Sequence, residues 1–193
     1  MISKDREYRS FEFTTEEMRA EGKPVAFEQP TMLYEIDGIK FYEVIDRRAF
    51  DEANMSDVVL NIDHEGKPAA KTKNSTLQLR VADDGLYMVA DLSKNATGRE
   101  LYEDIQNGFF DKMSFAFTVR EEEYDKKSRT RRIMKIDRLF DVSAVTFPAY
   151  AQTSIMARDI FSMELEKERM ELRQREDKRK RLALKLKIEG SLE

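Results

Sequence analysis

Hydrophobic and polar residues alternate along much of residues 1–156, and this period of two is typical of half-buried β-strands. A clear case runs through Leu77, Leu79 and Val81, and a second alternating run follows over residues 86–92. The two runs are separated by a short polar turn that contains Asp and Gly, which predicts a β-hairpin. We therefore expect two neighbouring antiparallel strands here.

The same pattern predicts the other elements of the body. Strands are expected over residues 38–45, 58–62, 112–120 and 132–145, the last two joined by a charged turn over residues 121–131. A short helix is expected over residues 47–53. A second helix should begin at Thr97, which has capping-box spacing to Glu100, and end at Gly108. Many strands with one or two capped helices predict an α+β fold that is mostly β and barrel-like.

The composition changes abruptly near residue 157. Residues 158–187 contain no Gly or Pro and are dominated by Glu, Lys, Arg, Met and Leu, which predicts a long charged helix. We expect a folded domain over residues 1–156 and a helical tail over residues 157–193, the last four of which resemble a cloning scar. The apolar positions of the tail fit a heptad only with gaps, so a solvated, marginal helix is the plainer interpretation. The alternative is a segment that docks on partner chains, mediates self-association or is removed on activation.

Composition and charge exclude several classes of function. The chain has 193 residues and a net charge of −4, so no overall attraction to nucleic acid or anionic membranes is expected. It has no cysteine, which excludes disulfides, a thiol nucleophile and Cys-based metal sites. No segment resembles a signal peptide or reaches the roughly 20 apolar residues of a membrane helix. Residues 178–181 are basic and could suggest a nucleic-acid-binding module, but the acidic body and the lack of an aromatic stacking motif argue against it. We expect an intracellular protein with no membrane or nucleic-acid partner.

His64 is the only histidine of the chain and the first candidate for chemistry. It follows the apolar run 58–62 and lies in a polar turn that ends at Pro68. Imidazole is the side chain best suited to proton transfer near neutral pH. An ordinary exposed loop histidine is the plainer alternative. Without a cysteine or a second histidine, a zinc or iron site is not expected, and no other cofactor is indicated.

Ser114 and Asp141 are the other two candidates. Ser114 shares one face of its strand with Ala116 and Thr118, while the opposite face is bulky and apolar. The small face is expected to be open, giving a substrate backbone access to a nucleophilic hydroxyl; plain alternation in a half-buried strand is the alternative. Asp141 lies inside an otherwise apolar strand, where a buried carboxylate needs a partner such as an imidazole. The alternative for Asp141 is an edge-strand carboxylate that faces water.

The segments around these residues resemble the sequence blocks of a known family. Residues 41–50, the histidine block 60–64 followed by Pro68, the serine block 112–117 and the last block 140–150 resemble those of tailed-phage prohead maturation proteases. The resemblance covers about residues 20–156, with all blocks in order. That family is distantly similar to the herpesvirus assembly protease, which implies a small β-barrel flanked by helices.

The resemblance implies catalytic roles for the three candidates. Ser114 would be the nucleophile, His64 the general base, and Asp141 the residue that orients the imidazole. Two residues depart from the family pattern: Ala116 replaces a usual Gly, and Asp141 replaces a more usual Glu. The herpesvirus proteases use a second histidine as third member, which this chain lacks. Backbone amides or an arginine such as Arg99 are candidates for the oxyanion donors.

The function implied is that of a serine endopeptidase in phage head maturation. It would cleave capsid precursor and scaffold chains, and itself, inside the immature prohead in the host cytoplasm, or in a bacterial cytoplasm if prophage-encoded. No cofactor or metal is implied. The alternative is a catalytically silent capsid-assembly or scaffolding protein that has kept the protease fold.

Overall fold

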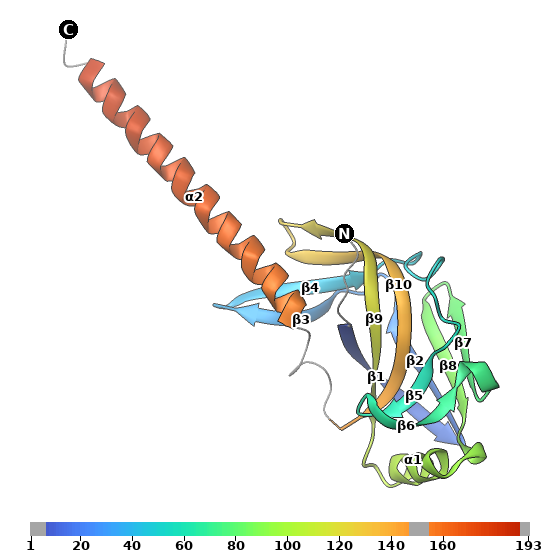
Figure 1. The fold of residues 1–193 in the computed structure, drawn as a ribbon. Coiled ribbons are helices and arrows are strands. Elements are labelled where there is room, and N and C mark those ends of the chain that lie inside the picture. The colour runs from blue at the N-terminus through green and yellow to red at the C-terminus, as the bar shows by residue number, and fades with distance from the viewer. Residues whose placement is uncertain (1–6, 147–154, 190–193) are drawn as a thin grey trace. The chain divides into compact units, whose positions relative to one another are not determined.

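The structure is a computed structural model that describes residues 7–146 and 155–189 (Figure 1). The contacts divide the chain into two units, Met1–Ile155 and Met156–Glu193. We call the first the body and the second the tail, and describe each by itself. Residues 147–150 of the last family-like block and the scar-like residues 190–193 lie outside the described ranges.

The described part of the body is mostly β. Its strands are β1 (Glu7–Glu16), β2 (Arg19–Ala26), β3 (Thr31–Ile36), β4 (Ile39–Ile45), β5 (Val59–Ile62), β6 (Glu65–Lys71), β7 (Leu77–Ala82), β8 (Gly85–Asp91), β9 (Lys112–Asp125) and β10 (Thr130–Val145). The helix α1 (Ala96–Gln106) and the single-turn 3₁₀ segments η1 (Thr72–Asn74) and η2 (Leu92–Lys94) connect them. The prediction of a mostly β fold is therefore confirmed, with one α-helix in the body.

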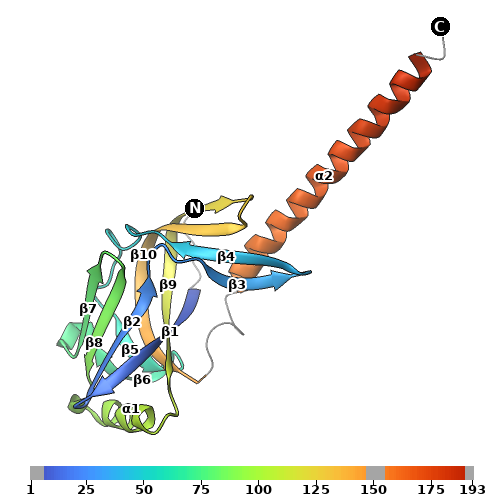
Figure 2. The same cartoon turned by 180° about the vertical axis from the view of Figure 1, so that it is seen from behind.

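The long strands β9 and β10 form the spine of one sheet, as both views of the body show (Figures 1 and 2). The strand order is β3-β4-β10-β9-β1-β2-β8-β7. Strand β10 pairs antiparallel with β9, while its other edge pairs in parallel first with β4 and then with β5. Two separate strands thus share one edge of β10, and β5 carries β6 on its far side.

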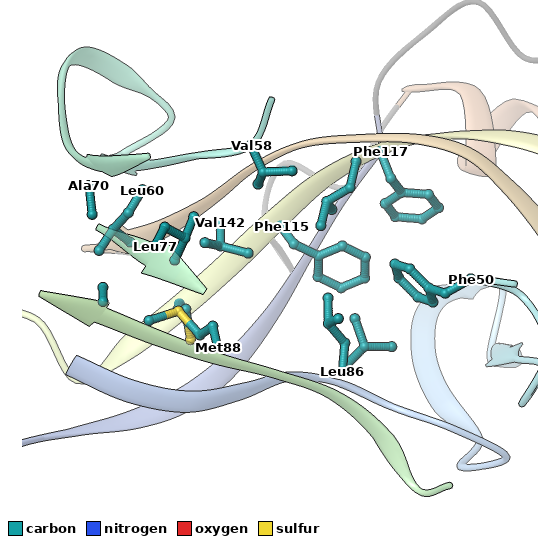
Figure 3. Packing of buried hydrophobic residues seen from close by; sticks show 14 of the residues in the cluster. Phe50, Val58, Leu60, Ala70, Leu77, Leu86, Met88, Phe115, Phe117 and Val142 are labelled. Carbon is teal, nitrogen blue, oxygen red and sulfur yellow. The ribbon is translucent and has the colours of Figure 1, made fainter. Parts of the chain in front are cut away.

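The expected closed barrel is not formed. Among the described residues the order of paired strands begins at β3 and ends at β7, so no hydrogen-bonded seam closes the sheet. Side chains from β5 to β8 and from β9 and β10 nevertheless meet in one core cluster (Figure 3). The curved sheet therefore buries its apolar face by bending over itself.

The core explains why β9 and β10 form where alternation predicts them. Phe115 and Phe117 of β9 stack with ring centroids 4.9 Å apart, and both are fully buried. Figure 3 shows Leu86 and Met88 of β8 on the opposite side of the core from Phe115. The predicted hairpin over β7 and β8 is confirmed, with Leu77 paired to Ala90.

The helix expected over residues 47–53 is absent; consecutive turns occupy residues 47–52. The amides of Ala49, Asp51 and Ala53 donate to the carbonyls three residues earlier, but the bonds occur only at every second residue. The Asp46 carboxylate also accepts from the Arg48 amide at 2.9 Å. A short polar side chain that bonds to nearby backbone in this way competes with helix formation.

The N-cap of helix α1 lies two residues earlier than the capping box predicts. Its N-cap is Asn95 rather than Thr97, and the Asn95 Oδ1 accepts from the Gly98 amide at 2.6 Å. The Asn95 Nδ2 donates to the Ala69 carbonyl of β6 at 3.1 Å. One side chain thus caps the helix and anchors it to the sheet. The predicted end at Gly108 is confirmed, with φ at +77°.

Several strands escaped prediction because they carry no clear alternation. These are β1, β2, β3 and β6; β2, for example, reads Arg-Ala-Glu-Gly-Lys-Pro-Val-Ala. The charged stretch over residues 121–131 is mainly strand as well, with the turn limited to residues 126–129. These segments become strands because they pair with a neighbouring strand, and the local sequence pattern does not show that pairing.

The tail contains one long helix, α2 (Ile155–Glu189), as the composition predicts. No helix in the described residues is long and apolar enough to cross a membrane. The first part of this helix buries Phe161 and Leu165, whereas residues 169–181 are all exposed, so the later part gains little from burial of an apolar face.

We expect the tail to be separable from the body. Limited proteolysis should leave a folded core that ends near residues 150–160, because exposed and charged helices open more readily than a packed sheet. Deleting residues 160–193 should leave a cooperative thermal transition with nearly the wild-type midpoint. A body that unfolds on this deletion would show that the tail is part of the core.

Candidate active site

A tight turn between β5 and β6 presents His64. Asp63 and His64 both adopt left-handed backbone angles, with φ of 46° and 64°. The turn is shorter than the polar segment suggests, because β6 already begins at Glu65. Asp63 fastens it to the end of β10: its amide donates to the Ala144 carbonyl at 2.8 Å, and its carboxylate accepts from the Thr146 amide at 2.9 Å. Positive φ at both central residues is typical of a two-residue hairpin turn, and the contacts of Asp63 hold this turn against β10.

The imidazole of His64 lies against the carboxylate of Asp141. The Nδ1 atom of His64 is 2.6 Å from Oδ1 of Asp141, and the two side chains are 19% and 5% exposed. A carboxylate at Nδ1 favours the tautomer with its proton on that nitrogen, which directs the Nε2 lone pair to accept a proton. The structure thus brings together two of the three candidates.

A β-bulge decides which face of β10 carries Asp141. Phe117 of β9 pairs with Leu139, and the next residue, Ala116, pairs with Asp141, so β10 has one extra residue at this point. Leu139 and Val142 both face the core. Without the extra residue, Asp141 would share the core face with Leu139. The bulge instead turns the carboxylate to the opposite face, where His64 meets it.

Ser143 is a member of the site that the sequence did not single out. Its Oγ donates to Oδ1 of Asp141 at 2.7 Å, and the residue is fully buried. The one signal for it in the sequence is a small polar residue two positions after Asp141, on the same face of the strand. Asp141 therefore accepts on one oxygen from both Ser143 and His64.

Ser114 lies on β9 directly opposite Ser143 of β10. Antiparallel residues that face each other in this way have Cβ atoms about 4.5–5.5 Å apart. The Ser114 Oγ atom is buried and has no hydrogen-bond partner. Ser114 is therefore next to the His64–Asp141 pair, one strand away, without bonding to the imidazole.

The expectation that Ser114 occupies an open face is wrong for this structure. Ser114 and Ala116 are both 0% exposed, and Thr118 is 5% exposed. Strand β9 lies between β1 and β10, and every residue from Met113 to Val119 is buried. Alternation identifies which residues share a face, but it does not report whether that face is covered.

Asn61 lies next to Ser143 on the side of β10 away from Ser114. It is the register partner of Ser143 on β5, so Asn61, Ser143 and Ser114 form a line across three strands. The Asn61 Oδ1 atom is buried without a hydrogen-bond partner. Unpaired buried polar atoms are rare in folded proteins. Two of them therefore flank the Asp141 cluster, one on each side.

Other candidate groups do not join this cluster. The guanidinium of Arg99 donates to the Ser93 carbonyl at 2.8 Å, within the segment that leads into α1. Within the described ranges, no three His, Asp or Glu side chains gather closely enough to hold a metal ion. The chemistry available at the site is that of an imidazole, a carboxylate and hydroxyls, which is the set used in acyl transfer.

An ion cluster closes the base of the β5–β6 hairpin that holds His64. Asp57, just before β5, lies 2.8 Å from Lys71 Nζ and 2.7 Å from Lys73 Nζ. Hydrogen bonds from Lys71 and then Lys73 lower the pKa of the Asp57 carboxyl from its ordinary 3.8 to about 2. The folded protein thus favours the ionised form of Asp57.

Asp57→Asn is expected to destabilise the hairpin in a pH-dependent way. Because the pKa of Asp57 is lowered on folding, its contribution is fully present above pH 3.8 and is lost as the pH falls through about 2. The thermal midpoints of wild type and variant should therefore differ at pH 6 and converge toward pH 2. Asp111, 76% exposed and 4.0 Å from Lys112, provides the control: Asp111→Asn should show little difference at either pH.

The chain is similar to known proteins over most of its length. The family model described as caudovirus prohead serine protease matches residues 4–168. Among solved structures, the capsid assembly protease gp21 of bacteriophage T4 is similar, with a TM-score of 0.49 and 11% identity over 73% of this chain and 97% of that chain. A search of curated proteins finds no match.

Proposed function

Since the chain belongs to the caudovirus prohead serine protease family, we propose that it is a serine endopeptidase of phage head maturation. Its substrates would be capsid precursor and scaffold chains, and the protease itself. The observation that carries the proposal is the 2.6 Å contact of His64 with the buried Asp141, beside Ser114 on the adjacent strand. An imidazole oriented by a buried carboxylate, with a serine on the strand adjacent to that carboxylate, provides the groups that acyl transfer requires.

The proposed reaction assigns one role to each residue. The Oγ of Ser114 attacks the scissile carbonyl carbon, and Nε2 of His64 takes the hydroxyl proton. The same imidazole then gives that proton to the leaving amine, and a water molecule hydrolyses the acyl-enzyme by the same steps in reverse order. Asp141 holds Nδ1 and stabilises the imidazolium that forms each time Nε2 accepts a proton.

Substrate binding requires a change in the conformation described here. Ser114 is fully buried, so a peptide cannot reach its hydroxyl until the covered face opens. The same change would bring the hydroxyl and the imidazole within hydrogen-bond distance, since catalytic hydrogen bonds often tighten only when substrate is bound. We propose that this opening accompanies activation in the prohead.

The proposed setting is the interior of the immature prohead in the host cytoplasm. There the tail would dock the protease among scaffold or capsid chains, or mediate its self-association. Residues 178–181 are Lys-Arg-Lys-Arg and exposed, and would attract an acidic surface. Removal of the tail on activation would release the protease from this contact.

Co-expression with the capsid precursor of the same phage tests the proposal. Mass spectrometry should find the precursor cleaved at defined peptide bonds with the wild-type chain. His64→Asn should retain the fold but lose the cleavage, because an amide cannot serve as general base. A precursor and a protease chain that both stay intact with wild type would overturn the proposal.

A catalytically silent assembly protein is the second candidate function. The specific observation in its favour is that the Ser114 hydroxyl is covered and makes no hydrogen bond. In that case His64→Asn would support head assembly and maturation as well as wild type does. The same co-expression experiment, followed by electron microscopy of the shells, separates the two candidates.

A further inference from the structure

We infer that Ser143 is a positioning residue of the proposed catalytic site, fixing the Asp141 carboxylate in the orientation that His64 needs. The inference rests on the proposed function, and it assigns different roles to two serines that face each other. Ser114 is the nucleophile of the proposal, whereas Ser143 acts through Asp141.

Two donors converge on a single carboxylate oxygen. Oδ1 of Asp141 is 2.7 Å from Ser143 Oγ and 2.6 Å from His64 Nδ1. Rotation about the last torsion of an aspartate is only loosely restricted, so one contact does not fix the plane of the carboxylate. Ser143 lies on the same strand as Asp141 and is held by its ladder on both sides, with Asn61 and Ser114 as register partners. Its hydroxyl therefore provides a fixed reference for the carboxylate, to which the more exposed imidazole then aligns.

Burial strengthens this contact. Ser143 is 0% exposed and Asp141 is 3% exposed. Hydrogen bonds to a charged acceptor are stronger than those between neutral groups, and a low-dielectric environment strengthens them further. Without the hydroxyl, the carboxylate would lose a partner that water does not readily replace in a closed site.

The hydrogen-bond pattern distinguishes the two serines. The hydroxyl proton of Ser143 is donated to a carboxylate, so this proton is not presented to an imidazole nitrogen. The Ser114 hydroxyl has no such partner and can turn toward the base. Ser143 thus fits a positioning role, and Ser114 keeps the role of nucleophile.

The test compares Ser143→Ala with Thr118→Val in the full chain. Thr118 is 5% exposed, lies on β9 four residues after Ser114, and loses its hydroxyl without losing its shape. Cleavage is measured on a peptide that spans the site found in the capsid precursor. Ser143→Ala should lower kcat by about 10- to 100-fold with KM nearly unchanged. Effects of this size are typical when a residue that orients a functional histidine indirectly is removed. Thr118→Val should leave both constants as in wild type.

A second readout does not depend on activity. His64 is the only histidine, so the imidazole NMR signals of the chain belong to this residue alone. In wild type we expect a downfield, slowly exchanging Nδ1 proton. Ser143→Ala should shift and broaden this signal, whereas Ser143→Thr, which keeps the hydroxyl, should preserve it. Ser143→Thr also covers the case in which the alanine variant fails to fold.

The outcomes separate this inference from the proposed function. If wild type cleaves, and Ser143→Ala changes neither kcat nor the His64 signal, the inference is wrong and the proposed function stands. If Ser143→Ala loses cleavage as completely as Ser114→Ala, Ser143 is not a positioning residue but part of the reacting set. If wild type never cleaves, but Ser143→Ala still alters the His64 signal, the proposed function fails and the positioning contact stands.

Discussion

Ser114→Ala is expected to abolish cleavage of the capsid precursor while the fold remains intact. The variant removes the only oxygen that we propose as nucleophile, and the His64 imidazole alone cannot form the proposed acyl-enzyme. Loss of a nucleophile in this type of site lowers kcat by about 10⁶-fold, so no product should be detected. Mass spectrometry of the co-expressed precursor gives the result directly.

Stability should respond in the opposite sense. The Ser114 hydroxyl is buried without a partner, and an unsatisfied buried hydroxyl destabilises the folded state. Its removal should therefore leave the free energy of unfolding unchanged or raise it by up to about 1 kcal/mol. Urea unfolding of both proteins measures this difference.

The exposed Ser128, in the turn between β9 and β10, provides the matched control. Its hydroxyl donates to Asp125 far along the strands from the site, so Ser128→Ala makes the same chemical change outside it and should cleave normally. A folded Ser114→Ala protein that processes the precursor at the wild-type rate would refute Ser114 as nucleophile. It would also favour the silent assembly protein.

Phe115→Ala is expected to show the largest loss of stability among the changes considered. Phe115 is the neighbour of Ser114 on β9, is 0% exposed, and stacks on Phe117 at 4.9 Å between ring centroids. Truncating a buried phenylalanine removes the burial energy of the ring and leaves a cavity, at a cost of about 3–5 kcal/mol. This is a large part of the 5–15 kcal/mol that holds a typical domain folded. Urea unfolding at 25 °C should show a midpoint shifted far below that of wild type.

Phe109 offers the same substitution at the surface. Its side chain is 70% exposed, so Phe109→Ala should change the free energy of unfolding by no more than about 0.5 kcal/mol. A Phe115→Ala protein about as stable as the Phe109→Ala protein would show that the described core is not the one the protein has in solution.

Periodicity in the sequence predicted the elements with a consistent apolar face. Met113, Phe115 and Phe117 alternate with small residues, and the structure places all three in the core. The β7–β8 hairpin and the long helix α2 were predicted for comparable reasons, a turn between two alternating runs and a stretch without Gly or Pro. Which residues share the apolar face of a strand, and whether a segment can form a helix, depend mainly on residues near one another in the chain, so the sequence reports them directly.

Tertiary pairing decided the elements that local pattern does not report. Residues 47–52 form turns because Asp46 bonds to the following backbone, and α1 is capped by Asn95 because that side chain also reaches Ala69 of β6. In residues 7–146, β3 and β7 at the two ends of the strand order do not pair with each other, so the barrel that the family resemblance implied is not closed. The cap on α1 and the strand pairing depend on partners distant in sequence, whereas the Asp46 contact is local and only its competition with helix formation went unpredicted.

For the candidate site too, the sequence determined some features and the tertiary structure decided others. From its residue types and blocks, the sequence by itself determined His64, Ser114 and Asp141 as candidates and the family to which the chain belongs. Only the tertiary structure decided that an extra residue in β10 turns Asp141 away from the core and toward His64, and that Ser143 shares its oxygen. It also decided that the face of Ser114 is covered. The sequence states the chemical type of each residue. Its neighbours in space are set by strand register and by bulges, which shift a side chain from one face of a sheet to the other.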